Sequence, residues 1–169
     1  SEKTAFRELK AIGDMKAEQI SEWYTERLAD AEEVMQNELI QLQAIDILRG
    51  KSDPAEISRV LQWIISRKNS DKYTRFVLFD QTGKQILSYP VDNDHKDVSK
   101  DSLFMSTLEQ YCVNVSDLHQ DTQESSGQIA KIIMNFWIPV SIGNGKAEGC
   151  WMVQYNPEQY LYPLIQRWP

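Results

Sequence analysis

The residues that could carry chemistry are few and scattered. The 169-residue chain has two histidines, His95 and His119, and two cysteines, Cys112 and Cys150. It contains no glycine-rich phosphate loop, no nucleophile elbow and no zinc-protease motif, so neither histidine has the partners that nucleophilic or acid–base catalysis requires. The cysteines are too far apart in sequence for a zinc site, although neighbouring strands could pair them. The sequence predicts a chain without enzyme activity, cofactor or metal.

Two polar residues inside apolar segments indicate binding instead. Arg75 lies among the aromatic residues of segment 74–79, and Asn135 interrupts the apolar run 132–137. A buried guanidinium or amide costs a few kcal/mol unless it is hydrogen-bonded. Each residue therefore either has a partner within the protein or faces a polar, wet cavity.

We expect such a cavity on the face of a sheet opposite a long N-terminal helix, beneath residues 89–108, because a flexible polar cover over rigid strands is where binding groups collect. Arg75 could pair bidentately with a carboxylate or phosphate, and Asn135 could orient a carbonyl or hydroxyl group. A register error of one residue would move any of these side chains to the opposite face. The predicted site residues are Arg75, Tyr89, His119, Asn135, Trp137 and Tyr155.

Composition excludes several classes of protein. The chain is 41% hydrophobic and 25% charged, which is typical of one folded domain and not of a disordered chain. Its net charge of -7, without clustered basic residues, argues against a nucleic-acid partner and against a basic membrane-surface binder. No apolar stretch reaches the roughly 20 residues that a membrane-spanning helix needs.

Residues 1–50 differ in kind from the rest of the chain. Their apolar residues recur at intervals of three and four, which predicts a single long helix with one apolar face. A helix of about 35 residues would extend roughly 50 Å, more than a domain of this size can cover. Part of it must project or pair with another helix. A second helix begins at Asp53 and Pro54, an N-cap residue followed by proline at the first helical position.

From Tyr73 the apolar period changes from about four to two, which indicates strands. The sequence predicts an α+β fold in which a long N-terminal helix packs on an antiparallel sheet of about five strands, with short covering helices. The expected elements are a hairpin formed by strands 74–79 and 84–89 around the turn 80–83, a helix at 102–109, strands near 113–118, 129–142 and 149–155, and a last helix that opens at Asn156 and Pro157.

Several strings resemble the Cache (PAS-like) extracytoplasmic sensor domains of bacterial histidine kinases, and the resemblance covers nearly the whole chain. The segment KAEQISEW at 16–23, continued at 26–31, is similar to the helix that leaves the first membrane span in such receptors. Residues 79–84 resemble their first hairpin and residues 115–119 their third strand. Residues 157–169 resemble a segment that continues into a second module.

The resemblance implies a domain outside the cytoplasm, between two membrane helices that this chain lacks. It implies a long signalling helix at residues 1–50 and a PAS-like ligand-sensing domain at 51–169. The expected partners are a small organic molecule, such as an organic acid, and a second copy bound through the N-terminal helix. Amino-acid-binding members carry an Arg, Trp and Tyr cluster before the third strand. Residues 88–108 have only Tyr89 of that cluster, so specificity for amino acids does not carry over and the resemblance does not identify the ligand.

Two alternatives remain. The same module could belong to a methyl-accepting chemoreceptor. The chain could also be a cytoplasmic PAS domain whose aromatic pocket holds a haem or flavin, and an absorbance spectrum would distinguish this case.

Overall fold

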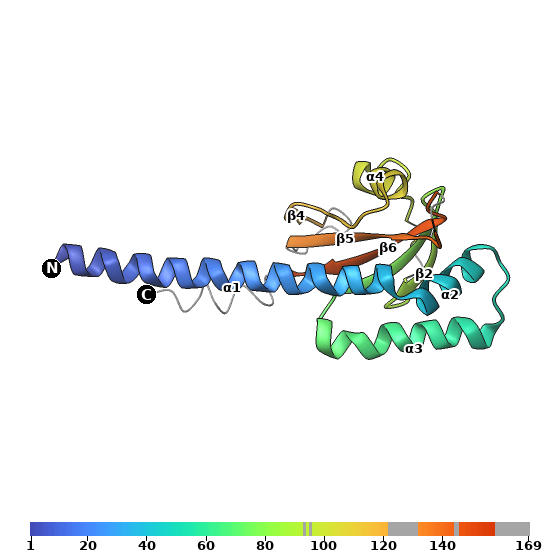
Figure 1. Ribbon diagram of the computed structural model, residues 1–169, viewed down its shortest axis with the longest axis horizontal. Coiled ribbons are helices and arrows are strands. Elements are labelled where there is room, and N and C mark those ends of the chain that lie inside the picture. The colour runs from blue at the N-terminus through green and yellow to red at the C-terminus, as the bar shows by residue number, and fades with distance from the viewer. Residues whose placement is uncertain (93, 95, 122–131, 144–145, 158–169) are drawn as a thin grey trace.

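Helices cover both faces of one antiparallel sheet (Figure 1). The computed structural model describes residues 1–92, 94, 96–121, 132–143 and 146–157. The predicted α+β class is confirmed, and the sheet has six strands. The elements in chain order are α1 (Glu2–Gln36), α2 (Glu38–Leu48), α3 (Pro54–Asp71), β1 (Arg75–Asp80), β2 (Gln85–Tyr89), α4 (Ser102–Gln110), β3 (Asn114–Val115), β4 (His119–Gln120), β5 (Ile132–Val140) and β6 (Gly149–Tyr155).

Helix α1 has 35 residues, and its first half projects away from the sheet (Figure 1). Trp23 is the first residue of α1 with a described and buried side chain, and its ring packs edge-on against Tyr155 with centroids 5.9 Å apart. The expectation that the helix is longer than the domain can cover is therefore confirmed. Within the described ranges, no helix combines the length and the apolar character needed to cross a membrane.

The predicted helix over residues 1–50 is wrong in one respect, because it is broken at Asn37. The backbone of Asn37 is extended (φ -77°, ψ 94°), and its side-chain oxygen accepts a hydrogen bond from the Ile40 N–H at 3.2 Å. Asparagine is a strong N-cap because its short side chain replaces the missing helical partner of such an N–H group. The break turns α2 so that Ile40, Ala44 and Ile45 enter the core.

The buried amide of Gln41 ties this break to the sheet. Its Nε2 donates to the backbone oxygens of Pro139 on β5 and of Met35 near the end of α1, at 2.7 and 3.3 Å. Its Oε1 accepts a hydrogen bond from Trp151 Nε1 on β6 at 3.3 Å. One side chain thus joins α1, α2 and two central strands.

The sheet runs in the order β2-β1-β6-β5-β3, and β4 also pairs with β5. The predicted hairpin is confirmed, because β1 and β2 pair around the turn at Asp80. The expected strand 113–118 is shorter in the structure, where only Asn114–Val115 (β3) form a strand, and the unpredicted strand β4 follows at His119–Gln120. The strand expected at 129–142 corresponds to β5, and residues 129–131 lie outside the described ranges. Most of the helix expected from Asn156 and Pro157 also lies outside them.

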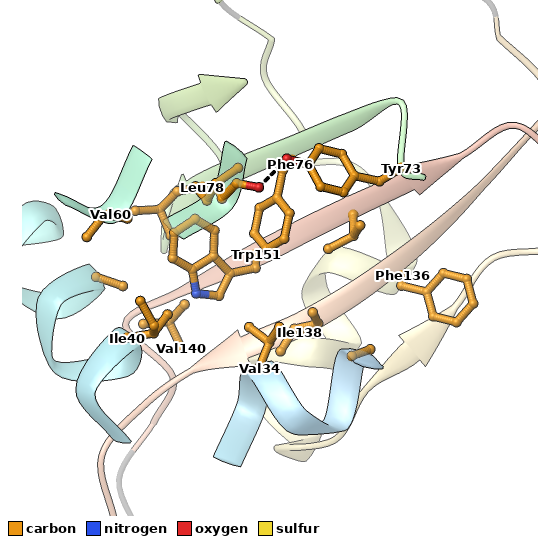
Figure 2. Packing of buried hydrophobic residues seen from close by; sticks show 14 of the residues in the cluster. Val34, Ile40, Val60, Tyr73, Phe76, Leu78, Phe136, Ile138, Val140 and Trp151 are labelled. Carbon is orange, nitrogen blue, oxygen red and sulfur yellow. Dashed lines mark hydrogen bonds between the residues drawn. The ribbon is translucent and has the colours of Figure 1, made fainter. Parts of the chain in front are cut away.

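The two faces of the sheet have separate cores. Helices α1–α3 cover one face, where Phe76, Trp151 and Ile138 pack against Val34, Ile40 and Val60 (Figure 2). The opposite face packs against α4, with Val77, Phe79, Trp137 and Met152 among its buried residues. Successive strand residues alternate between these faces, as the pleat of a strand requires.

The split of α1 into a projecting half and a packed half predicts unequal effects of truncation. Replacing Trp23 with Ala should lower the free energy of unfolding by about 3–5 kcal/mol, because a buried indole is lost from the core. Replacing Phe6, which is 69% exposed on the same helix, should change it by less than about 0.5 kcal/mol. Urea denaturation of both variants measures the difference. Equal losses would mean that the two halves of α1 are packed alike.

Candidate ligand-binding site

Three polar side chains form one row across the central strands. The strand register pairs Arg75 of β1 with Gln154 of β6, and Gln154 with Asn135 of β5. Gln154 Nε2 donates to Asn135 Oδ1 at 3.2 Å, and Thr74 Oγ1 donates to Gln154 Oε1 at 3.3 Å. Because partners in register share a face, all three side chains project from the face opposite α1.

A cavity of about 160 Å³ lies over this row. Its apolar wall consists of Phe79, Val98, Ile133, Trp137 and Met152. Its polar lining consists of Arg75, Lys96, Asp101, His119, Gln120, Asp121, Asn135 and Gln154. The cavity thus joins a region of charged and amide side chains to an apolar wall, which is the composition expected of a site for a small polar molecule.

Four of the six predicted site residues line this cavity: Arg75, His119, Asn135 and Trp137. The other two predicted residues, Tyr155 and Tyr89, lie on the opposite face of the sheet, under α1–α3. Tyr155 follows Gln154 on β6 and therefore points to the α1 face, where it packs on Trp23 and Phe136. Tyr89 pairs with Phe76 and joins the same core. Strand parity, which the sequence alone leaves open, is the physical reason for both corrections.

Trp137 brings a buried donor to the cavity wall. Its side chain is 1% exposed, and among the described residues its indole Nε1 has no hydrogen-bond partner. A buried N–H group without a partner costs roughly 1–3 kcal/mol. Such a donor beside a cavity would be satisfied by an acceptor oxygen of a bound molecule.

The cationic end of the cavity holds two basic side chains. Arg75 Nη2 donates to Asp92 Oδ2 at 3.1 Å. Burial lowers the pKa of Lys96 below its usual value, and the neighbouring Arg75 charge lowers it further. Asp121, Asp92 and Asp94 act in the opposite direction. The field at this end therefore depends on the two basic side chains and on the three carboxylates around them.

The segment that covers the cavity is fixed at two points. Val98 N–H donates to the Gly83 oxygen at 3.0 Å, and a Cβ atom at Gly83 would lie 2.5 Å from Ser99 N. Only glycine allows this approach, and its φ of +89° also favours glycine. Farther along, Asp101 caps α4 by accepting from the Leu103 and Phe104 N–H groups. The turn at Gly83 thus positions Lys96 and Val98 over the sheet.

Sequence reasoning missed Gln154 and Lys96. Gln154 interrupts the apolar strand β6 in the way that Asn135 interrupts β5, so the same argument could have found it. Lys96 lies in a polar loop, where no periodicity distinguishes a lining residue from a solvated one.

The histidines and cysteines form no catalytic or metal-binding group with one another among the described residues. His95 is outside the described residues, and His119 Nδ1 lies 2.8 Å from the Asp117 oxygen. Cys112 is exposed and Cys150 is buried, both as free thiols. Burial raises the pKa of Cys150 to about 12, which keeps this thiol protonated. The described part of the chain contains no cluster of three or more ligating side chains suited to a metal ion.

The coupling between Arg75 and Lys96 predicts a measurable titration. Replacing Arg75 with Gln should raise the pKa of Lys96, because removal of a nearby positive charge favours the protonated ammonium. Nuclear magnetic resonance of the lysine side chains across a pH series measures this value. Arg49→Gln is a matched control, since Arg49 pairs with Glu148 outside the cavity. An unchanged Lys96 pKa in the Arg75 variant would contradict the proximity of the two groups.

The structure is similar to solved sensor domains, although no family model and no curated protein sequence matches the chain. The ligand-binding domain of the Campylobacter jejuni chemoreceptor Tlp3 in complex with L-norvaline superposes with a TM-score of 0.71 at 14% identity, over 99% of this chain and 64% of that one. The sensor domain of the V. cholerae histidine kinase DctB gives 0.65 at 13% identity, over 98% and 60%.

A third match is the ligand-binding domain of the Pseudomonas aeruginosa PAO1 amino acid chemoreceptor PctC in complex with GABA, with a TM-score of 0.64 at 22% identity, over 94% of this chain and 64% of that one. The chain thus spans about three fifths of the length of these structures. These likenesses confirm the fold expected from the sequence resemblance, and the chain has the architecture of a Cache (PAS-like) sensor domain.

Proposed function

We propose that the chain is the extracytoplasmic small-molecule-sensing domain of a transmembrane histidine kinase. The observation that carries this proposal is the cavity lined by Arg75, Asn135 and Trp137 on one face of a sheet whose other face holds a projecting helix. The fold, shared with the DctB sensor domain, supports it. In this proposal the chain itself is non-catalytic, and the kinase activity belongs to the rest of the receptor.

The ligand that fits this cavity is a small anion with a short apolar part. A cavity of about 150 Å³ accommodates a molecule the size of benzene, so about 160 Å³ suits a ligand of roughly six to eight non-hydrogen atoms. Arg75 and Lys96 would hold its carboxylate, and Asn135 would orient a polar group. L-norvaline and GABA, present in the Tlp3 and PctC structures, both carry a carboxylate.

Strand β5 connects the ligand site to the helix. Asn135 and Trp137 line the cavity, whereas Phe136 between them points to the opposite face. There the Phe136 ring lies 6.0 Å from Tyr24 of α1 and 5.3 Å from Tyr155. A shift of β5 on ligand binding would therefore move a side chain that is in direct contact with α1. This contact supports α1, the first helix within residues 1–50, as the signalling helix of a sensing domain at 51–169.

A chemoreceptor is the second candidate for the whole receptor. The Tlp3 and PctC matches favour it as much as the DctB match favours a kinase. The encoded sequence downstream of the chain decides between them, because a kinase and a methyl-accepting domain differ there. For the cytoplasmic alternative, a visible absorbance band of the purified protein would indicate a bound haem or flavin.

The projecting half of α1 is the surface that we assign to a second copy of the chain. Phe6, Leu9, Met15 and Ile20 are exposed on it, whereas Trp23 is already buried within the domain. Apolar side chains in helical spacing that the sheet does not cover gain stability by pairing with an identical helix. We therefore expect a weak homodimer of the isolated chain.

The ligand assignment predicts which variants lose binding. A carboxylate at 100 times its Kd should stabilise the wild-type chain by about 2.7 kcal/mol in a thermal-shift assay. Arg75→Gln and Asn135→Ala should reduce this stabilisation, whereas Arg49→Gln should retain it. The screen uses butyrate, succinate and L-norvaline, with butyramide as the uncharged control. Equal stabilisation of all variants would mean that Arg75 and Asn135 are structural and that the site lies elsewhere.

The dimer assignment predicts a position-specific effect on association. Leu9→Glu should weaken self-association several-fold in sedimentation equilibrium, because it places a charge in the apolar stripe. The neighbouring variant Lys10→Glu also introduces an acidic residue, but at an exposed polar position, and should have the smaller effect. A monomeric wild-type chain at high concentration would contradict the assignment.

A further inference from the structure

Asp92 places a carboxylate of the chain itself against Arg75, which lines the cavity, although Asp92 is not a lining residue. It bonds to Arg75 at 3.1 Å, and the two side chains are only 26% and 14% exposed. Asp92 lies in the loop between β2 and α4, whereas Arg75 is fixed on strand β1. The pair therefore joins this loop to the sheet at the guanidinium that an anionic ligand would use.

Both members of the pair have hydrogen-bonding groups that the other member does not use. Only one nitrogen of Arg75 is bonded to Asp92, although a guanidinium offers five N–H donors. The other oxygen of Asp92 accepts from the Asp94 N–H at 2.8 Å, so a local turn holds this carboxylate in place independently of Arg75. Arg75 can therefore exchange partners without loss of the turn at Asp92.

The charges around the pair set the conditions for such an exchange. Lys96 lies beside Arg75 and forms no ion pair with the described residues, and the carboxylates of Asp92, Asp94 and Asp121 act on its charge. A ligand carboxylate is attracted by Arg75 and Lys96. It is repelled by Asp92 when both approach the same guanidinium.

We propose that Asp92 is an internal competitor that sets the affinity and the selectivity of this cavity for anions. The inference rests on the proposed function, because it assumes that a carboxylate binds at Arg75. A ligand carboxylate binds by replacing Asp92 at the guanidinium. Its apparent affinity is reduced by the fraction of time for which Asp92 holds Arg75. If the pair is closed for about nine tenths of the time, the reduction is about tenfold.

The test compares two charge-removing variants two residues apart. Asp92→Asn removes the competing charge but keeps a side-chain oxygen that can accept the turn hydrogen bond. Asp94→Asn removes the same charge from an exposed side chain that also acts on Lys96 but bonds no cavity residue through its carboxylate. Calorimetric titrations of the wild type and both variants use butyrate, succinate and L-norvaline, with butyramide as the uncharged probe.

We expect Asp92→Asn to raise the affinity for the carboxylates about three- to tenfold and to leave the affinity for butyramide unchanged. Asp94→Asn should change either affinity by less than about twofold. Equal gains in both variants would show a general charge effect and overturn the inference, as would an unchanged or weaker affinity in Asp92→Asn. In each of those cases binding by the wild type leaves the proposed function intact. If no probe binds any of the three proteins, the proposed function fails and the inference fails with it.

Discussion

The three central strands have to serve two covered faces at once. Because side chains alternate along a strand, each of β1, β6 and β5 contributes one set of residues to the core under α1–α3. The other set faces the core under α4 and the cavity on the same side of the sheet. Asn135 and Phe136 illustrate the consequence, since these adjacent residues face the cavity and helix α1, respectively. The ladder between β5 and β6 keeps this register over seven residue pairs, from Met134 to Val140. A slip by one residue would exchange the two faces, so register is the condition on which both the core and the site depend.

The helical layer depends in turn on satisfying polar groups at the break in the N-terminal helix. Carbonyl groups in the last turn of a helix have no helical partner, and burying one without a hydrogen bond is costly. Gln41 bonds the Met35 carbonyl and also the carbonyl of Pro139, while it accepts from Trp151. A polar residue inside an apolar core thus fixes the angle between α1 and α2 on the sheet. An apolar side chain at this position would leave all three groups to find other partners.

How much of the structure can be predicted from the sequence depends on which structural signals act locally along the chain. Caps such as Asp53, turns such as Asp80–Gly83 and periodicities in the long helix act within a few residues, and the corresponding elements were predictable. The break at Asn37 was missed because the apolar spacing continues across it. The cavity was partly predictable, since Arg75 and Asn135 are polar residues in apolar strands. Tyr89 and Tyr155 were misplaced because the face of a strand is decided by tertiary register, and Lys96 is brought to the site by a loop anchored on Gly83.

The same arrangement constrains how strongly a ligand could act on α1. A ligand shifts a conformational equilibrium only by the difference between its affinities for the two states. In a cavity of about 160 Å³ that difference must come from a few polar contacts, among which Arg75 joins the sheet to the cover. Each contact to a charged group contributes roughly 1.5–3 kcal/mol, so two to four would be needed to invert a population from 1:99 to 99:1, which takes about 5.5 kcal/mol. The polar row supplies three side chains on three adjacent strands. Two of these strands, β6 and β5, also carry Tyr155 and Phe136, which pack on Trp23 and Tyr24 of α1, so a shift of the row would act where α1 packs.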